Sequence, residues 1–388
     1  MRRMIYADNA ATTKLDIDAF EAMRPYLLED YANPSQPYFF SKKVKYALKD
    51  ARKTIAECIG ANPEEIYFTS GGTESDNWAL KCFGNSGDIR RIVTSAVEHH
   101  AILHACKATG YEVKILPVNA VGIVSNEDLI NSLEWGSRPI PSSLSTLVSV
   151  MLVNNEIGTI EPVKELAAIA HKYGAYFHTD AVQGVGHIPI NVEELGIDML
   201  SASAHKFNGP KGIGFLYIRK GIKIVPYENG GTQENGMRAG TENVASIVAM
   251  ATALKKNCEN MVETEKLLYT LEKRLLERLK DAKIPFIRNG YEEHVPGNIS
   301  LSIKNVSGEM LLHRLDLMGI CVSTGSACDS VNTQVSHVIN AIGVPKEYAE
   351  GTIRISLGRD NTKDDIDEIA QALIRILTQL EKSPYSKL

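Results

Sequence analysis

The sequence contains little cysteine, and its six cysteines follow no recognised framework. They lie at positions 58, 82, 106, 258, 321 and 328, with no Cys-x-x-Cys pair and no cysteine–histidine spacing typical of a zinc site. A disulfide framework and a zinc module are therefore both excluded. Four of the six fall in helix-like segments, where we expect small core residues.

Long apolar runs and an excess of basic charge are also missing. No run approaches the roughly 18 apolar residues that span a bilayer. Acidic side chains outnumber basic ones by 47 to 42, for a formal net charge of −5, and the basic residues are scattered. This balance does not favour nucleic acid. The basic start Met1–Met4 is not followed by the apolar segment of a targeting signal, so we expect a cytoplasmic protein without membrane or direct nucleic-acid partners.

What the chain does have is an alternation of short apolar runs and amphipathic helical patterns as far as about residue 220. This alternation is typical of an α/β domain with a mostly parallel sheet, whose ligands bind at the carboxyl ends of the strands. The expected strands are Glu65–Ser70, Arg91–Ala96, Glu112–Pro117, Thr146–Val153, Ala175–Thr179, Met199–Ala202 and Gly214–Ile218, and the expected helices include Lys43–Ile59, Glu74–Phe83, Asn126–Leu133 and Val163–Tyr173.

A second, smaller unit is expected after this part, in line with the length of 388 residues. Apolar residues at helical spacing predict one long helix from about residue 241 to residue 280, which would link the two units. The pattern beyond it predicts strand Asn298–Ile303, helix Gly308–Leu317, strand Gly351–Leu357 and a last helix from Lys363 with Thr362 as N-cap.

Lys206 is the strongest candidate for chemistry. It follows an apolar run and precedes a glycine-rich turn, a position that is poorly explained as surface charge. A lysine in this position can form a Schiff base with an aldehyde cofactor. Asp180 ends another apolar run and, as an anion, would hold the ring nitrogen of pyridoxal phosphate (PLP) protonated. The pair therefore predicts PLP.

The segment Ser70–Ser75 joins an expected strand to an expected helix. Gly72 lets the backbone approach an anion, and the Thr73 hydroxyl with nearby N–H groups can bind a phosphate at the helix N-terminus. An ordinary glycine turn with Thr73 as N-cap is the alternative. Ser203 and His205, close to the candidate lysine, can donate to the same phosphate.

Two further polar groups follow expected strands. His99 could stack on a planar ring and exchange protons, although a lone histidine is more often packed or solvated. Asn155 follows the expected strand Thr146–Val153, where an amide can hydrogen-bond a cofactor hydroxyl or a carboxylate.

Cys328 and Arg354 are candidates for handling a substrate. Cys328 lies among small residues that imply an exposed, mobile loop with an accessible thiol. The alternative is an incidental surface cysteine. Arg354 interrupts an apolar strand pattern and needs a partner there, either a substrate carboxylate or an internal salt bridge.

Together these motifs resemble the cysteine desulfurases of class V within the fold-type I PLP-dependent enzymes, of the nitrogen-fixation and iron–sulfur-cluster assembly type. The resemblance covers essentially the whole chain, in the family's order and spacing. One departure is Tyr38 and Ser41, where many members have a histidine and a glycine. The matching motifs are Tyr6–Thr13, Asn33–Ser35, Ser70–Asn77, Glu98-His99, Asn154–Gly158, His178–Gln183, His205–Gly214, Gly236–Thr241, Ser323–Cys328 and Arg354–Arg359.

The resemblance implies a fold and a set of cofactor ligands. The fold would be a large domain at residues 15–260, with a mostly parallel seven-stranded sheet, and a smaller α+β domain formed by residues 1–14 and 261–388. The enzyme would be a homodimer. The implied cofactor-binding residues are Lys206 for the Schiff base, Asp180 for the pyridine nitrogen, Asn155 and Gln183 for the phenolic oxygen or the substrate, and Gly72, Thr73, Ser203 and His205 for the phosphate, joined by Thr241 of the second subunit.

The resemblance also implies the reaction. L-cysteine would bind through its carboxylate to Arg354, with Lys206 and His99 moving protons. Cys328 would take the sulfur as a persulfide, leaving L-alanine, and pass it to acceptor proteins such as an iron–sulfur scaffold. The interval from Cys328 to Arg354 resembles the subgroup with a long cysteine loop that hands sulfur directly to several acceptors.

Other functions stay open on the sequence. A selenocysteine lyase shares the scaffold and differs in its need for the loop cysteine. An aminotransferase has no use for that cysteine. From a different class, the chain could be a PLP-bound platform for docking partners, although its full set of catalytic residue types argues against this.

Overall fold

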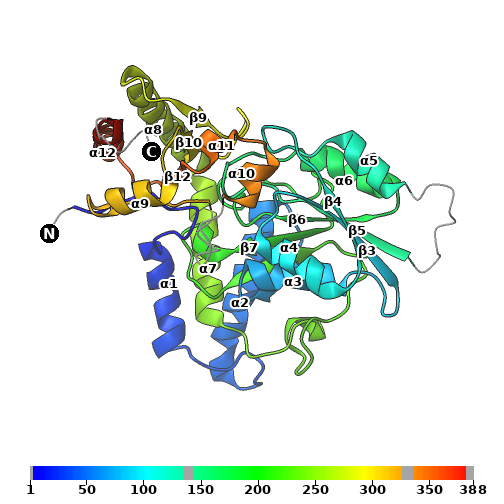
Figure 1. Cartoon of the computed structure of the whole chain (residues 1–388). Coiled ribbons are helices and arrows are strands. Elements are labelled where there is room, and N and C mark those ends of the chain that lie inside the picture. Colours follow the sequence, from blue (N-terminus) through cyan, green and yellow to red (C-terminus); the bar gives the residue numbers. More distant parts are fainter. Residues whose placement is uncertain (1–2, 135–143, 326–334, 382–388) are drawn as a thin grey trace.

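A seven-stranded sheet forms the centre of the larger part of the molecule (Figure 1). The computed structural model of the chain describes residues 3–134, 144–325 and 335–381. The strand order is β2-β8-β7-β6-β5-β3-β4, and all neighbours are parallel except β8, which is antiparallel to both β2 and β7. This confirms the predicted α/β class. The strands are β2 (Ile66–Thr69), β3 (Ile89–Ser95), β4 (Glu112–Leu116), β5 (Leu144–Ser149), β6 (Tyr176–Asp180), β7 (Met199–Ser203) and β8 (Gly214–Ile218).

Helices cover both faces of this sheet, which explains why its central strands β6 and β7 are buried along almost their whole length rather than at alternate residues. Neighbouring residues of one strand enter different cores: Val148 joins one buried cluster and Leu147 the other. One core includes residues of α1 (Ile17–Leu28), α2 (Lys42–Ile59), α5 (Asn126–Leu133), α6 (Val163–Lys172) and α7 (Val244–Glu259), and the other includes residues of α3 (Gly72–Cys82) and α4 (His100–Thr109).

Several boundaries in this part differ from the prediction. Helices α1 and α4 were not predicted, and Pro25 inside α1 interrupts its helical pattern. Strand β5 ends at Ser149, not at Val153 as predicted. Beyond it the amide of Met151 donates to the Glu98 carboxylate instead of to a neighbouring strand.

The single long helix predicted for residues 241–280 is wrong. Two helices occupy this stretch, α7 and α8 (Met261–Asp281), and the chain leaves helical geometry at Asn260, where φ is −102° and ψ is 8°. The apolar residues of α7 pack in the core of the seven-stranded sheet, whereas Leu268, Leu271 and Leu275 of α8 pack in a separate core. Two helices that bury their faces against different cores cannot continue as one straight rod.

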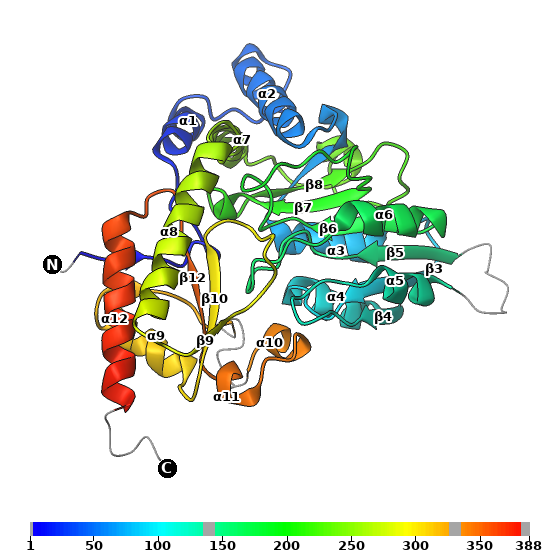
Figure 2. The ribbon, with the colours of Figure 1, turned by 90° about the horizontal axis from the view of Figure 1, so that it is seen from above.

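The second core belongs to the smaller part of the molecule. A three-stranded antiparallel sheet of order β12-β10-β9 is covered by α8, α9 and α12, with α12 packed along α8 (Figure 2). The chain start returns here, because β1 pairs in parallel with β11. The remaining elements are β1 (Ile5–Tyr6), β9 (Phe286–Arg288), β10 (Asn298–Ile303), α9 (Gly308–Asp316), β11 (Ile320–Cys321), α10 (His337–Ala341), α11 (Lys346–Ala349), β12 (Thr352–Ser356) and α12 (Lys363–Glu381).

The predicted N-cap of the last helix is confirmed. The Thr362 hydroxyl accepts from the amide of Asp365 at 3.2 Å, and the Asp365 carboxylate accepts from the amide of Thr362 at 2.8 Å. The domain boundaries at residues 15–260, 1–14 and 261–388 stay a prediction. Among the described residues, no helix combines the length and the apolarity that a bilayer crossing requires.

Candidate active site

A cavity of about 390 Å³ lies at the carboxyl ends of β6 and β7, as expected for a parallel sheet. It brings together ten of the predicted site residues: Gly72, Thr73, His99, Asn155, Asp180, Gln183, Ser203, His205, Lys206 and Arg354. Thr241 is exposed and does not line this cavity in its own chain. Cys328 lies outside the described residues.

Lys206 reaches the cavity from the short 3₁₀ turn Ala204–Lys206 that follows β7. Its Nζ donates to the carbonyl oxygens of Ala10 at 2.6 Å and Ala11 at 2.9 Å. The Gln183 amide donates to the same Ala10 carbonyl at 2.9 Å. The N-terminal segment therefore holds the amine against the cavity wall.

Asp180 ends β6 and is only 5% exposed. Its Oδ1 accepts from the amide of Val182 at 2.9 Å. Burial raises the pKa of Asp180 to about 6, although the Val182 amide and the charge of Lys206 oppose that rise. A cationic group placed against this carboxylate would therefore be strongly favoured.

A second buried carboxyl, Asp76 of α3, lines the same cavity and was missed as a site residue. Burial and the neighbouring Asp180 raise its pKa well above the ordinary value. His178 lies 3.9 Å from its Oδ1, and burial lowers the pKa of this histidine to about 3. A signal was present in the sequence, because Asp76 stands three residues after Thr73 and so on the same helix face.

The first turn of α3 forms one end of the site. Gly71 occupies its N-cap with φ +151°, so Thr73 lies in the first turn, and the alternative that makes Thr73 the cap is wrong. A Cβ at Gly72 would come within 2.6 Å of the Val182 side chain, so only glycine fits there without movement. A hollow of about 360 Å³ adjoins the cavity here and shares Gly72, Thr73, Ser203 and His205 with it.

Two histidines, His99 and His205, line the cavity, and both are held neutral. His99 caps α4 through Nδ1, which accepts from the amide of Ala101 at 3.1 Å, so the ring proton is on Nε2. His205 Nδ1 lies 3.1 Å from the Thr12 hydroxyl. Burial and then the charge of Lys206 lower the pKa of both histidines to about 4.

Arg354 enters the cavity from the small sheet, where it is 6% exposed in β12. Its guanidinium donates to Asp8 Oδ1 at 2.8 Å and to the backbone oxygen of Asn155 at 2.9 Å. The internal salt bridge weighed against a substrate carboxylate is therefore present. The buried Nε has no partner among the described residues, which leaves one donor free for an anion. Asp8 was missed as a site residue, although it lies in the motif Tyr6–Thr13.

The residues of the cavity fit PLP. The amine of Lys206 and the buried carboxylate of Asp180 face the same cavity. The N-terminus of the 11-residue helix α3, with the hydroxyls of Thr73 and Ser203, forms the other end of this cavity. The volume lies within the range of small cofactor sites. The orphaned Nε of Arg354 adds a donor for the carboxylate of an amino acid.

Comparisons with known proteins agree with this geometry. Residues 5–369 match the family described as aminotransferase class-V. A cysteine desulfurase IscS of Dictyoglomus turgidum is 47% identical over 100% of this chain and 98% of that protein. A cysteine desulfurase IscS of Methanosarcina thermophila is 46% identical over 97% of this chain and 93% of that protein. A solved NifS-like protein superposes with a TM-score of 0.88 at 37% identity, covering 97% of this chain and 100% of that one. A structure of SspA in complex with cysteine superposes with a TM-score of 0.77 at 31% identity, covering 92% of this chain and 100% of that one.

The fold, the lysine–aspartate cavity and these matches define a PLP-dependent enzyme of the class-V aminotransferase family. Within that family, the chain belongs to the cysteine desulfurases.

Proposed function

We propose that this enzyme converts L-cysteine to L-alanine and transfers the sulfur to Cys328 as a persulfide, from which acceptor proteins such as an iron–sulfur scaffold receive it. The observation that carries the proposal is the convergence of Lys206, Asp180 and Arg354 on one cavity. The relative crystallised with cysteine supports an amino-acid substrate of this kind.

Each residue of the cavity has a defined task in this proposal. PLP, when bound, supplies an electron sink for negative charge at the α-carbon of the substrate. Asp180 keeps the ring nitrogen protonated, because a cation stabilises its buried carboxylate. Gly72, Thr73, Ser203 and His205 hold the phosphate. Arg354 orients the substrate carboxylate, through the Nε donor that is otherwise unpaired.

Two residues move protons. Lys206 takes the proton from the α-carbon and returns it there at the end of the reaction. His99 is neutral near pH 7, because burial lowers its pKa to about 4. Its Nε2–H can therefore donate, and the ring can accept a proton in the reverse direction.

Sulfur transfer balances without an outside oxidant. The Cys328 thiolate attacks the sulfur of the substrate, so a sulfur–sulfur bond forms while the carbon–sulfur bond breaks. The bonding electrons stay with the substrate carbon, which is then protonated to give L-alanine. The products are L-alanine and the Cys328 persulfide.

The proposal includes a homodimer in which Thr241 of the second subunit completes the phosphate site, and a cytoplasmic location. The exposure of Thr241, away from the cavity of its own chain, supports the first. The described cysteines are all free, as persulfide chemistry in a reducing compartment requires.

The test is alanine formation from L-cysteine by purified, PLP-loaded protein with reductant, alongside Cys328→Ser. The wild type should form alanine and sulfide, and Cys328→Ser should lose both while keeping its PLP absorbance. Cys321→Ser is the matched control, because Cys321 is a partly exposed free thiol that does not line the cavity. Sulfur transfer by Cys328→Ser would refute the role of this thiol. No alanine from the PLP-loaded wild type would point to another substrate.

A further inference from the structure

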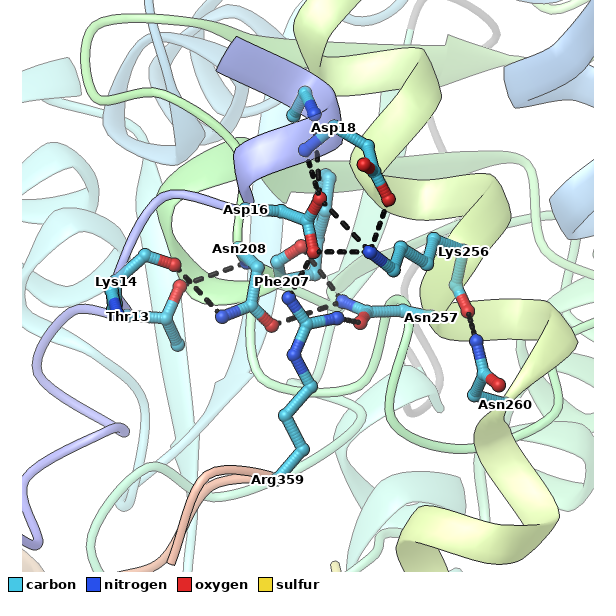
Figure 3. Close-up of polar contacts among 11 residues, drawn as sticks. Thr13, Lys14, Asp16, Asp18, Phe207, Asn208, Lys256, Asn257, Asn260 and Arg359 are labelled. Carbon is cyan, nitrogen blue, oxygen red and sulfur yellow. Dashed lines mark hydrogen bonds and ion pairs between the residues drawn. The ribbon is translucent and has the colours of Figure 1, made fainter. Parts of the chain in front are cut away.

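Arg359 reaches from the small part of the molecule to the large one, three residues after the end of β12 (Figure 3). Its Nη2 pairs with the Asp16 carboxylate, and its Nη1 donates to Asn257 Oδ1 at 3.3 Å. Asp16 caps α1, and Asn257 lies in the last turn of α7. Both partners are almost fully buried, at 4% and 9% exposure.

The same two partners hold the turn that directly follows Lys206. The Asn257 amide donates to the carbonyl of Phe207 at 2.7 Å, and the backbone amide of Asp16 donates to the carbonyl of Asn208 at 2.9 Å. Asn208 adopts the left-handed region with φ +64°, a conformation that asparagine accepts more readily than other non-glycine residues. Figure 3 shows that these contacts converge on this turn.

The N-terminal segment restrains the turn from a further side. The backbone amide of Asn208 donates to the Thr13 hydroxyl at 2.8 Å, and the side-chain amide of Asn208 donates to the Lys14 carbonyl at 2.9 Å. The turn is therefore fixed by three parts of the chain. Arg359, on the segment that also carries Arg354, contacts two of the residues that hold the turn, Asp16 and Asn257.

Arg354 and Arg359 lie on one continuous and rigid piece of chain. Strand β12 is buried throughout and is hydrogen-bonded to β10 along its length. Arg354 lies within this strand, and Arg359 lies in the turn that begins three residues after its end. A short series of contacts then links Arg359 through Asn257 to the residue after Lys206.

The ion pair of Asp16 does not depend on Arg359 alone. Lys256 Nζ lies 3.0 Å from the same carboxylate oxygen. Replacing Arg359 with a neutral residue therefore leaves Asp16 paired, and the fold keeps a partner for its buried charge. The change removes the contacts of Arg359 with Asn257 and Asp16, the two partners that hold the turn.

We propose that Arg359 is a positioning residue for Lys206, which acts through Asn257 and Asp16 to hold the catalytic amine in register with the substrate-binding arginine. The proposal rests on the proposed desulfurase function. It separates the two arginines: Arg354 contacts the substrate, whereas Arg359 sets the geometry of the group that moves the proton. The loss should therefore fall on kcat rather than on KM.

The test compares Arg359→Gln with Arg274→Gln in the PLP-loaded enzyme. Arg274 also makes two contacts between elements, both with Asp367 at 2.7 Å, but joins α8 to α12 away from the cavity. Arg359→Gln should lower kcat for alanine formation by about tenfold to a hundredfold, since small misplacements of reacting groups cost rates of this order. KM should change by less than about twofold. Arg274→Gln should leave both unchanged.

Two readouts do not depend on turnover. The pH at which the absorbance of bound PLP changes should shift in Arg359→Gln, because it reports the surroundings of the Lys206 nitrogen. Amide hydrogen exchange should accelerate at residues 207 and 208 and not across the sheet. Arg359→Lys keeps the charge at Asp16 but offers one point of contact. Its values in both readouts should lie between those of the wild type and those of Arg359→Gln.

Asn257→Ala provides a second variant if Arg359→Gln folds poorly. It should reproduce the kcat loss, and the double variant should be no worse than the single ones, because both changes break one chain of contacts. An unchanged kcat, a loss confined to KM, or exchange that rises over the whole molecule would overturn the proposal. If the wild type forms no alanine, the proposed function fails, and the absorbance and exchange results still decide the role of Arg359.

Discussion

Burial sets the protonation state of the side chains in the active-site cavity. It lowers the pKa of His99 and His205 to about 4 and raises that of Asp180 to about 6. At neutral pH the imidazoles are therefore uncharged, whereas the carboxyl is mostly ionised, and a cation beside it would stabilise its charge further. A ring nitrogen that must stay protonated meets these conditions.

Replacing Arg354 with lysine should raise KM for L-cysteine by about tenfold to a hundredfold, with a smaller effect on kcat. A lysine carries one compact charge and cannot reproduce the planar fork, and a hydrogen bond to a charged group is worth about 1.5–3 kcal/mol. Steady-state kinetics of alanine formation measure this. Asp8→Asn is the control, because it removes the ion pair at 2.8 Å and keeps the guanidinium. A KM within about twofold of the wild type in Arg354→Lys would leave Arg354 as a structural ion-pair partner only.

Among single residues, the sequence was most informative where a polar side chain ends an apolar run. Lys206, Asp180 and His99 were found in this way, and each lines the cavity. Asp76 and Asp8 were missed, because the first lies inside a helix and the second pairs with a residue far along the chain. Their importance depends on neighbours that only folding supplies.

At the scale of elements, the turn between β2 and α3 is the most closely fitted part of the site. Gly72→Ala should weaken PLP binding by at least about tenfold, because the added Cβ would lie 2.6 Å from Val182, and overpacking of this kind costs about 1–3 kcal/mol. The measurement is a titration of the protein with PLP, followed by absorbance.

The double variant Gly72→Ala with Val182→Ala provides the control. It removes the clashing methyl group, so PLP affinity should return toward the wild-type value. Failure of Val182→Ala to restore binding, or wild-type affinity in Gly72→Ala alone, would show that steric fit against Val182 is not what requires glycine here.

The elements also show where the sequence misleads. The pattern over residues 241–280 is helical throughout, and the helical part of the prediction is correct. The interruption at Asn260 was not predicted, because no proline or glycine marks it. It arises from the two cores, which lie in different directions from this point of the chain.

For the molecule as a whole, three buried carboxyls should govern the pH dependence of stability. Burial raises the pKa of Glu98 and Glu161 to about 8 and that of Glu156 to about 7, from an ordinary value of 4.5. At these three carboxyls the folded chain therefore binds more protons than the unfolded chain between about pH 4.5 and pH 8. Their contribution to the free energy of unfolding should fall as the pH rises through this window.

Glu161→Gln tests this prediction away from the active site. Glu161 is 3% exposed, accepts one bond from the Val124 amide at 3.1 Å, and its Oε1 has no partner among the described residues. Removing its titration should reduce the slope of stability against pH by up to about 1.4 kcal/mol per pH unit. Denaturant unfolding at pH 5, 6.5 and 8 measures the slope. An unchanged slope would mean that this carboxyl ionises normally in the folded enzyme.

At acid pH, the protonation of paired carboxylates lowers the free energy of unfolding. Arg238 lowers the pKa of Glu74 against the opposing effect of burial. The stability that this pair contributes is present above about pH 4.5 and is lost as the carboxylate is protonated. Below about pH 6.5 the buried histidines add to this loss, because burial lowers the pKa of His178 to about 3 and that of His99 and His205 to about 4.

The sequence by itself determined the α/β class, the order of most strands and helices, and most of the polar residues that line the cavity, because hydrophobic period and strand-end position are local properties of the chain. The family resemblance followed from the same motifs. Only the tertiary structure decided which groups meet: Asp8 with Arg354, Asp76 beside Asp180, and Arg359 with Asp16 and Asn257. These pairs are separated by up to several hundred positions along the chain. Burial and contact over such distances are properties of the packed core, and no local pattern encodes them.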